Sequence, residues 1–128
     1  MSEQHALSGL QLAIMRVIWN RGEATVVDVQ EALREERGLA LTTIATMLKR
    51  LEARGVVVHR MEGRQFVYRA LVTEDLVKSS MVGQLTTRLF EGDPLALVNH
   101  LITEYEIDPG DLPRLARLIE EAEADDGE

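Results

Sequence analysis

The sequence predicts a mainly α-helical protein with one small β-hairpin, on two observations. Hydrophobic residues make up 45% of the 128 residues but aromatic residues only 4%, which is typical of an aliphatic, helix-rich core. Apolar residues also recur at the three- and four-residue spacing of helices along most of the chain. Only residues 56–61 and 65–70 change to the β-branched and aromatic runs of strands. A chain of this length suits one compact domain, or such a domain with an appendage.

The first helix is expected to begin after Ser8. Ser8 and Gln11 have the spacing of a capping box, in which each side chain accepts a hydrogen bond from the backbone N–H of the other residue. The helix should end between Asn20 and Gly22, where its single tryptophan can cover one edge of a small core. Its apolar side comprises Leu12, Met15, Val17, Ile18 and Trp19.

The second helix is expected to begin after Thr25, which forms another capping box with Asp28. It should run to about Arg37 and end at Gly38, because glycine readily adopts the left-handed conformation that follows a helix. Its apolar side comprises Val26, Val29, Ala32 and Leu33.

Residues 41–54 are expected to form a third helix with two different faces, capped by Thr42 or Thr43. Four apolar side chains fall on one stripe, and small, hydroxylated or basic ones point the other way. Short side chains let a helix approach a DNA major groove, and long cations reach bases and phosphates. Any surface helix has a polar face, however, so the neighbouring elements decide between these interpretations. The stripe is Ile44, Met47, Leu48 and Leu51, and the other face is Thr42, Thr46, Lys49, Arg50 and Ala53.

These neighbours favour a winged helix-turn-helix. The third helix follows the second after only residues 39–41, which is the spacing of a helix-turn-helix whose later helix contacts DNA. Two strand-like runs then flank residues 62–64 and predict a hairpin, the wing of this architecture. Arg60 and Arg64 lie near its tip, where they can meet phosphates or the minor groove. A purely structural hairpin with incidental arginines is the alternative.

Three more helices are expected after Thr73, which caps the first of them. Asp93 and Pro94 have the order of a cap and a first helical residue, and residues 107–113 form another break before the last helix, which frays into an acidic end. These short helices are too few to close a hydrophobic core in one chain, so we expect their apolar faces to pair with a second copy in a two-fold dimer. The alternative is that they fold back onto the N-terminal domain of the same chain. The predicted dimerisation residues are Leu76, Val77, Met81, Leu85, Leu89, Phe90, Leu97, Val98, Leu101, Leu115, Leu118 and Ile119.

The charge is divided along the chain. The net charge is −8, but residues 1–72 hold ten basic and eight acidic residues, whereas residues 73–128 hold four and fourteen. This asymmetry suits an N-terminal part that meets nucleic acid. For the acidic C-terminal part itself, a solvated surface kept for solubility is the favoured interpretation.

Several kinds of site are not expected. The chain has no cysteine, which excludes disulfides and thiolate metal or redox sites. His5, His59 and His100 lack metal-ligand spacing, and neither a nucleophile with its base nor a glycine-rich phosphate loop is present. No enzyme activity and no cofactor or metal is therefore expected. No membrane span or signal peptide is expected either, which predicts a cytoplasmic protein.

The sequence resembles the penicillinase repressor family, bacterial winged-helix repressors of β-lactamase and methicillin-resistance genes, with related copper-responsive repressors. The resemblance spans nearly the whole chain and implies a homodimer on a palindromic operator, with the third helix in the major groove. It rests on Leu7-Ser8, Ile14-Met15, Trp19, Thr25-Val26, Val29, residues 41–44, Leu48, Arg50-Leu51, Gly55, Gly63-Arg64, Tyr68, residues 90–92 and Leu97-Val98.

The chain also departs from that family. Gln11, Leu41 and Ala70 stand where the family often has an acidic, an aromatic and a proline residue, and these changes affect packing rather than the DNA face. Without cysteine, the copper-sensing motif of related members is missing. The β-lactam branch is induced by cleavage in the tail, commonly at an Asn-Phe bond, and the matching bond here is Asn99-His100.

Together these patterns predict a winged helix-turn-helix DNA-binding domain in residues 1–72 and a helical dimerisation domain in residues 73–128. The predicted function is a homodimeric transcriptional repressor on a palindromic double-stranded DNA operator, with a regulatory protease as a further partner through the candidate cleavage bond Asn99-His100. A winged-helix protein-interaction module and a small-molecule-responsive regulator are the alternatives. The predicted DNA-binding residues are Thr42, Thr43, Thr46 and Arg50 near bases, and Lys49, Arg54, Arg60 and Arg64 on phosphates.

Overall fold

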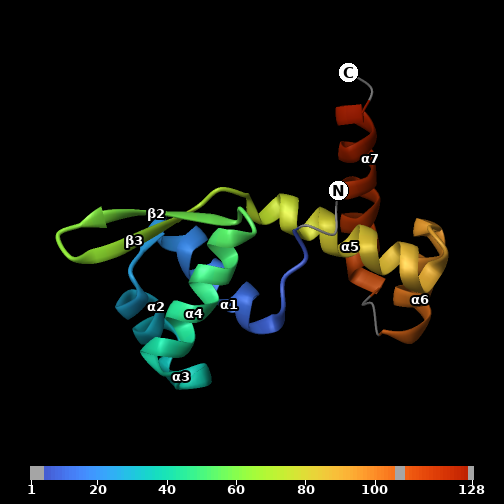
Figure 1. The fold of residues 1–128 in the computed structure, drawn as a ribbon. Helices are drawn as coiled ribbons and strands as arrows, with labels where there is room; N and C mark the ends of the chain where they lie inside the picture. Colours follow the sequence, from blue (N-terminus) through green and yellow to red (C-terminus); the bar gives the residue numbers. More distant parts are fainter. Residues whose placement is uncertain (1–4, 106–108, 127–128) are drawn as a thin grey trace. The chain divides into compact units, whose positions relative to one another are not determined.

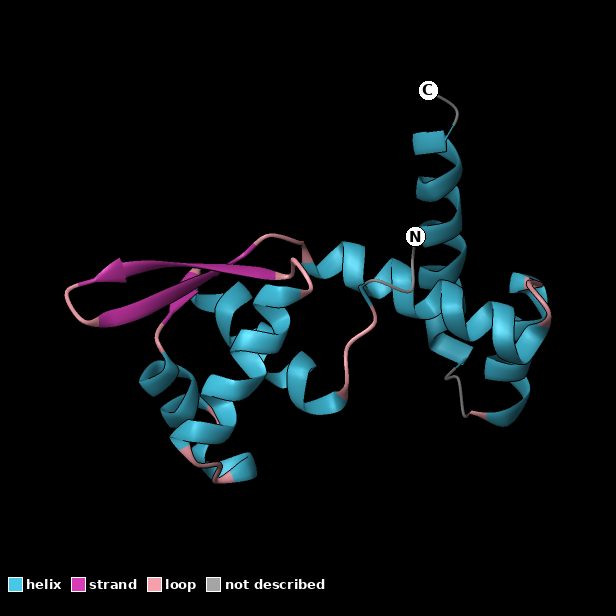
Figure 2. Cartoon of the chain, viewed as in Figure 1, coloured by secondary structure: helices cyan, strands magenta, loops and turns pink. Residues whose placement is uncertain are grey.

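The structure is a computed structural model that describes residues 5–105 and 109–126. Residue contacts divide the chain into two compact units, Met1–Leu85 and Thr86–Glu128, which we call the head and the tail. The predicted domain boundary after residue 72 stays a prediction. The elements, shown in Figures 1 and 2, are α1 (Gly9–Arg21), β1 (Glu23–Ala24), α2 (Val26–Ala32), α3 (Arg34–Arg37), α4 (Leu41–Ala53), β2 (Val57–Glu62), β3 (Gln65–Ala70), α5 (Glu74–Phe90), α6 (Pro94–Glu104), the short 3₁₀ helix η2 (Pro109–Asp111) and α7 (Leu112–Asp126).

Both predicted capping boxes are confirmed. At α1, the Gln11 N–H donates to Ser8 Oγ at 3.2 Å, and the Ser8 N–H donates to Gln11 Oε1 at 3.1 Å. At α2, the Thr25 N–H donates to an Asp28 carboxylate oxygen at 3.0 Å, and the Asp28 N–H returns a bond to Thr25 Oγ1 at 3.1 Å. These bonds satisfy backbone donors that have no partner inside the helix.

Two predictions about the helix-turn-helix were wrong in detail. The second helix is interrupted at Leu33, so that α3 forms a separate turn before Gly38, whose φ of 54° confirms it as the terminating residue. The N-cap of α4 is Ala40, without a side-chain cap, rather than a threonine. The Gln30 side chain donates to the Leu39 carbonyl at 3.1 Å. This bond holds the backbone at Leu39, one residue before the N-cap of α4. The helix therefore begins early enough that Thr42 and Thr43 both lie in its first turn.

The hairpin is confirmed, and a third strand joins it. β2 and β3 pair antiparallel from Val57–Ala70 to Glu62–Gln65 around a two-residue turn, in which Gly63 has a φ of 62°. Such turns favour glycine because they require positive φ. The sequence did not predict β1, which pairs with Arg69 and Tyr68 on the outer edge of β3. The sheet order is therefore β1-β3-β2, and we call the β2–β3 hairpin the wing.

One hydrophobic core holds the helices of the head against the base of the sheet. Trp19 lies at its edge, as predicted, and donates from Nε1 to the Val72 carbonyl at 2.9 Å. Val77 from α5 is also buried in this core, and Met81 packs against it. The predicted apolar stripe of α4 is confirmed, because Ile44, Leu48 and Leu51 are fully buried. The largest fully buried side chains are Ile14, Met15, Ile18, Val29, Ile44, Leu48, Leu51, Val56, Val57, Tyr68 and Val77.

The helix starts predicted after the wing are mostly confirmed. Thr73 Oγ1 accepts from the Leu76 N–H at 3.1 Å, and Asp93 caps α6 with Pro94 as its first residue. The last helix was predicted to begin after Pro113 and to fray from Glu120, but α7 runs from Leu112 to Asp126. Proline is tolerated in a first helical turn because its missing N–H has no intrahelical partner there.

Candidate nucleic-acid interface

The outer face of α4 gathers the hydroxyl and basic side chains that the sequence predicted. We define this face as Thr42, Thr46, Lys49 and Arg50, which are all exposed. Successive members of this set are four, three and one residues apart in the sequence. Thr43 is half-buried beside them. Within the described part of the chain, neither Lys49 nor Arg50 forms an ion pair, so both cations are available to an anionic partner.

The two predicted wing arginines differ in their surroundings. Arg64 lies exposed at the hairpin turn. Arg60 is engaged: its guanidinium lies 2.8 Å from Glu23 on β1 and 2.9 Å from Glu62 on its own strand. The bond to Glu23, followed by that to Glu62, raises the pKa of Arg60 above its already high ordinary value. Arg64 is therefore the freer of the two to meet a phosphate.

Arg54 was predicted to contact phosphates, but in the structure it holds the N-terminal segment. Its Nη2 donates to the Ala6 carbonyl at 2.7 Å, and its Nη1 donates to Gln11 Oε1 at 3.4 Å. Arg54 is also the C-cap of α4. These bonds tie the chain before α1 to the end of α4, so a phosphate would have to compete with them.

A cluster that the sequence did not reveal joins α4 to the wing. His59 Nδ1 lies 2.8 Å from both carboxylate oxygens of Glu52, and the His59 ring stacks on Phe66 with 4.0 Å between ring centroids. Burial, followed by the negative charge of Glu52, raises the pKa of the neighbouring Tyr68. The spacing of Glu52 and His59 matches no motif. Their contact arises only because Gly55, with a φ of 80°, turns the chain between α4 and β2.

The tail exposes most of its apolar side chains. None of residues 86–105 and 110–121, whose exposure is described, is buried, and Leu89, Leu95 and Leu118 are 66%, 76% and 60% exposed. Two residues predicted for dimerisation do not fit that role, because Val77 is buried in the head core and Met81 packs against it. Of the others, Leu76, Leu85, Leu89, Val98, Leu101, Leu115, Leu118 and Ile119 are exposed, and Phe90 and Leu97 are half-buried.

Comparison with known proteins decides the family. The model of the family described as Penicillinase repressor matches residues 7–121. The chain belongs to the penicillinase repressor family. It is 33% identical to the transcriptional regulator BlaI of Mycobacterium tuberculosis, over 99% of this chain and 92% of that protein. It is 26% identical to the penicillinase repressor of Bacillus licheniformis, over 90% of each chain.

A solved structure agrees with the fold of the head. The solution structure of the DNA-binding domain of the repressor BlaI superimposes with a TM-score of 0.52 and 33% sequence identity, over 59% of this chain and 93% of that one. The predicted fold class and family resemblance are thus confirmed. This penicillinase repressor family member is a transcriptional repressor with a winged helix-turn-helix DNA-binding domain, and not an enzyme.

The candidate cleavage bond of this repressor lies inside a helix. Asn99 and His100 are exposed in the middle of α6, and Thr103 Oγ1 donates to the Asn99 carbonyl at 3.0 Å. The His100 ring lies tilted against Phe90, with 5.6 Å between ring centroids. A protease that binds extended chain would therefore have to unwind α6 locally to reach this bond.

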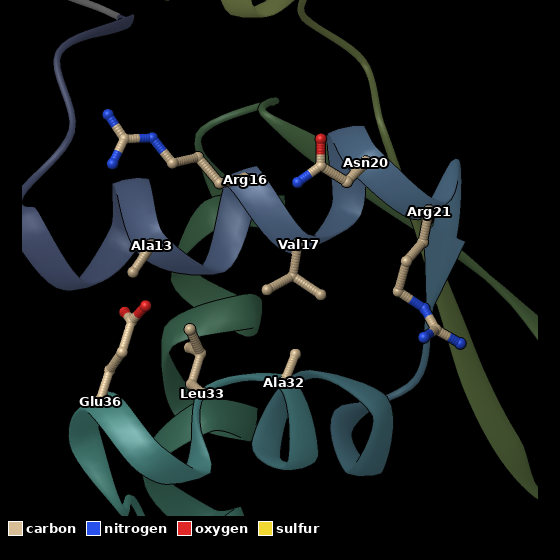
Figure 3. A pocket seen from close by; sticks show the side chains of 8 residues that line it. All are labelled: Ala13, Arg16, Val17, Asn20, Arg21, Ala32, Leu33 and Glu36. Atoms are coloured by element: carbon tan, nitrogen blue, oxygen red, sulfur yellow. The ribbon is translucent and has the colours of Figure 1, made fainter.

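A groove of about 430 Å³ runs across the repressor's head between α1 and the α2–α3 pair. Figure 3 shows Val17 facing Leu33 and Ala32 across its floor, with Glu36 directed from α3 toward α1. Arg21, at one end of the groove, forms an ion pair with Asp28 at 3.5 Å.

Among the residues that the structure describes, no cluster of His, Cys, Asp or Glu suits a metal ion. No helix in the same residues is long and apolar enough to cross a membrane.

Proposed function

We propose that this repressor acts as a homodimer on a palindromic operator. Two α4 helices enter successive major grooves about 10 bp apart, or a multiple of that distance. The observation that carries the proposal is the outer face of α4. It presents two threonines and two cations that form no ion pair within the described residues, opposite an apolar stripe whose Ile44, Leu48 and Leu51 are fully buried. Thr42, Thr43, Thr46 and Arg50 lie at or near base edges in this arrangement, and Lys49 and Arg64 contact phosphates.

The tail supports the two-fold arrangement. Most of its described leucines and isoleucines are exposed in the single chain, and a large exposed apolar surface marks an interaction site. A second copy can cover the same patch isologously, which gives a dimer with two recognition helices. One winged helix binds its half-site weakly, and joining two heads raises affinity by making the second contact intramolecular.

Binding to DNA from the region upstream of the protein's own gene tests this function. We expect fluorescence anisotropy to show tighter binding to that duplex than to a shuffled duplex of equal length. The logarithm of the affinity should fall linearly with the logarithm of salt concentration, because each phosphate contact releases counterions. Equal affinity for both duplexes, or an affinity that does not change with salt concentration, would contradict the proposal.

Relief by proteolysis belongs to the same proposal. Cutting α6 at Asn99-His100 would separate α7 from the head and remove part of the surface that joins the two copies. A variant with a specific protease site introduced after Asn99 tests this link. We expect cutting to release operator DNA while the head stays folded by circular dichroism. Continued operator binding after complete cutting would show that α7 is not needed.

A further inference from the structure

The contact between Glu52 and His59 is the one polar link that the structure describes between the α4 side chains and the wing. Since an ionised carboxylate can only accept hydrogen bonds, His59 Nδ1 must be the donor. It lies 2.8 Å from both Glu52 oxygens, and the His59 backbone N–H also donates to Glu52 Oε2 at 3.4 Å. Both side chains are about 30% exposed. The link therefore lies at the surface, beside the outer face of α4.

Phe66 extends this link to the second strand of the wing. Its ring is parallel to the His59 imidazole within 1°, at a centroid distance of 4.0 Å. The two residues are diagonal neighbours, because His59 is paired with Tyr68 and Phe66 with Met61. Phe66 is only two residues from Arg64. A contact that begins on α4 thus reaches nearly to the tip of the hairpin.

Beyond this cluster, the contacts that the structure describes for the wing lie on its β1 side: β1 pairs with Arg69 and Tyr68, and Arg60 reaches Glu23. Val57 and Tyr68 anchor its base in the core, whereas residues 60–66 are all exposed. Figure 1 shows the tip of the hairpin projecting away from α1, α2 and α4. A two-stranded hairpin is marginally stable by itself, so the direction of its tip depends on contacts near the base. Glu52 and His59 provide such a contact.

We propose that Glu52 and His59 are positioning residues for the DNA grip, which fix the angle between α4 and the wing. With that angle fixed, Arg64 meets the backbone flanking the half-site whose major groove α4 occupies. The inference rests on the proposed DNA-binding mode. The pair has a second effect, since His59 shields the Glu52 carboxylate, which would otherwise face the phosphates as an unpaired negative charge.

The test separates positioning from this charge effect. His59→Phe removes the side-chain donor, leaves the backbone N–H, and keeps a ring that can stack on Phe66. His59→Asn restores an N–H donor near the place of Nδ1. The double variant Glu52→Gln with His59→Phe removes the unpaired charge without restoring the link. Met61→Ala is the matched control, because Met61 lies on the same face of β2, is exposed and has no carboxylate partner.

Two chemical footprints on operator DNA at saturating protein provide the readout. Protection of guanine N7 reports α4 in the major groove, and hydroxyl-radical protection of the flanking backbone reports the wing. We expect His59→Phe to keep the first and lose the second, and the double variant to do the same. His59→Asn and Met61→Ala should keep both. The loss of affinity caused by Arg64→Ala should shrink about threefold in the His59→Phe background, because the two residues are then uncoupled.

Three outcomes would overturn the inference. Flank protection that persists in His59→Phe, with an undiminished effect of Arg64→Ala, would show that the wing is positioned without this pair. Loss of both footprints together with a lowered melting temperature would show a merely structural role. Absence of guanine protection by the unsubstituted protein would overturn the proposed DNA-binding mode, and the inference with it. This last result is distinct from the other two because it involves no variant.

Discussion

The Arg60 guanidinium on β2 lies 2.8 Å from Glu23 on β1, and so spans the middle strand of the sheet. On β3, Arg60 is in register with Val67, which is buried, and Glu23 is in register with Arg69. Both charged side chains are about half exposed, and exposed ion pairs contribute little to stability. The pair matters instead because it withholds a cation of the wing from any phosphate.

Releasing Arg60 from Glu23 should strengthen binding to DNA. We expect Glu23→Gln, which leaves Arg60 with only its contact to Glu62 on the same strand, to tighten binding to operator and random duplexes alike and to steepen the salt dependence by up to about one unit of slope per subunit, because the cation is then freer to reach a phosphate. Glu31→Gln is the matched control, since it removes the same charge from exposed surface of α2 without freeing an arginine. Equal salt slopes for the two variants would show that Arg60 stays away from DNA.

The α4 and wing arginines should separate specific from non-specific binding. Arg50→Ala is expected to weaken operator binding by about 1–3 kcal/mol while barely changing binding to random DNA, because a base contact is lost. Arg64→Ala should weaken both, because a phosphate contact carries no sequence information. Titration of each variant against both duplexes at fixed salt measures the difference. An equal loss on both duplexes for Arg50→Ala would remove Arg50 from the residues that contact bases.

The capping box of α2 should make stability depend on pH. The backbone N–H of Thr25, aided by its hydroxyl and by Arg21 and opposed by burial, lowers the pKa of Asp28. A lowered folded-state pKa contributes stability above the unfolded value of about 3.9, and this contribution is lost as pH falls through the folded pKa. We expect Asp28→Ala to cost about 1 kcal/mol at pH 7 and progressively less below about pH 4. Urea unfolding at several pH values measures this difference, and a cost that does not change with pH would contradict the assigned cause.

Local patterns in the sequence predicted most of the head. Ser8 with Gln11 and Thr25 with Asp28 are contacts between near neighbours, so spacing alone reveals them. The apolar stripe of α4 follows from helical periodicity, and the hairpin from two strand-like runs around Gly63. The outer face of α4 was predictable for the same reason, because its residues recur along a single helix.

Contacts between distant residues were not predictable in this way. β1 has only two residues, too few to show alternation, and it exists because β3 offers it an open edge. The hydrogen bonds of Arg54 to Ala6 and of Arg60 to Glu23 depend on tertiary structure, because the two partners of each bond lie at least 37 positions apart in the chain. The burial of Val77 was missed because periodicity gives the apolar face of a helix, but not the surface that covers it.

The end of α5 should become more stable when its strained residue is replaced. Glu91 has a φ of 52°, in the left-handed region, and the following Gly92 N–H donates to the Thr86 carbonyl at 3.0 Å. Because glycine adopts positive φ without steric cost, we expect Glu91→Gly to stabilise the protein by about 0.5–1 kcal/mol. Thermal unfolding measures the gain. Glu91→Ala is the control, since alanine keeps the strain, and an equal gain for both variants would attribute the effect to lost charge.

The exposed face of α7 should determine the oligomeric state. Leu118 is 60% exposed in the single chain, so Leu118→Glu should change the stability of a monomer by no more than about 0.5 kcal/mol. In a dimer that buries the side chain, the same change removes about 1.5–3 kcal/mol of apolar burial per copy and places a carboxylate in the interface. We therefore expect light scattering to show monomers for Leu118→Glu, with operator binding weakened to that of a single head. Val27→Glu is the matched control, because Val27 is an exposed apolar residue of the head at 44% and should leave the dimer intact. A Leu118→Glu protein that stays dimeric would exclude this face of α7 from the interface and assign dimerisation to the exposed side chains of α5 and α6.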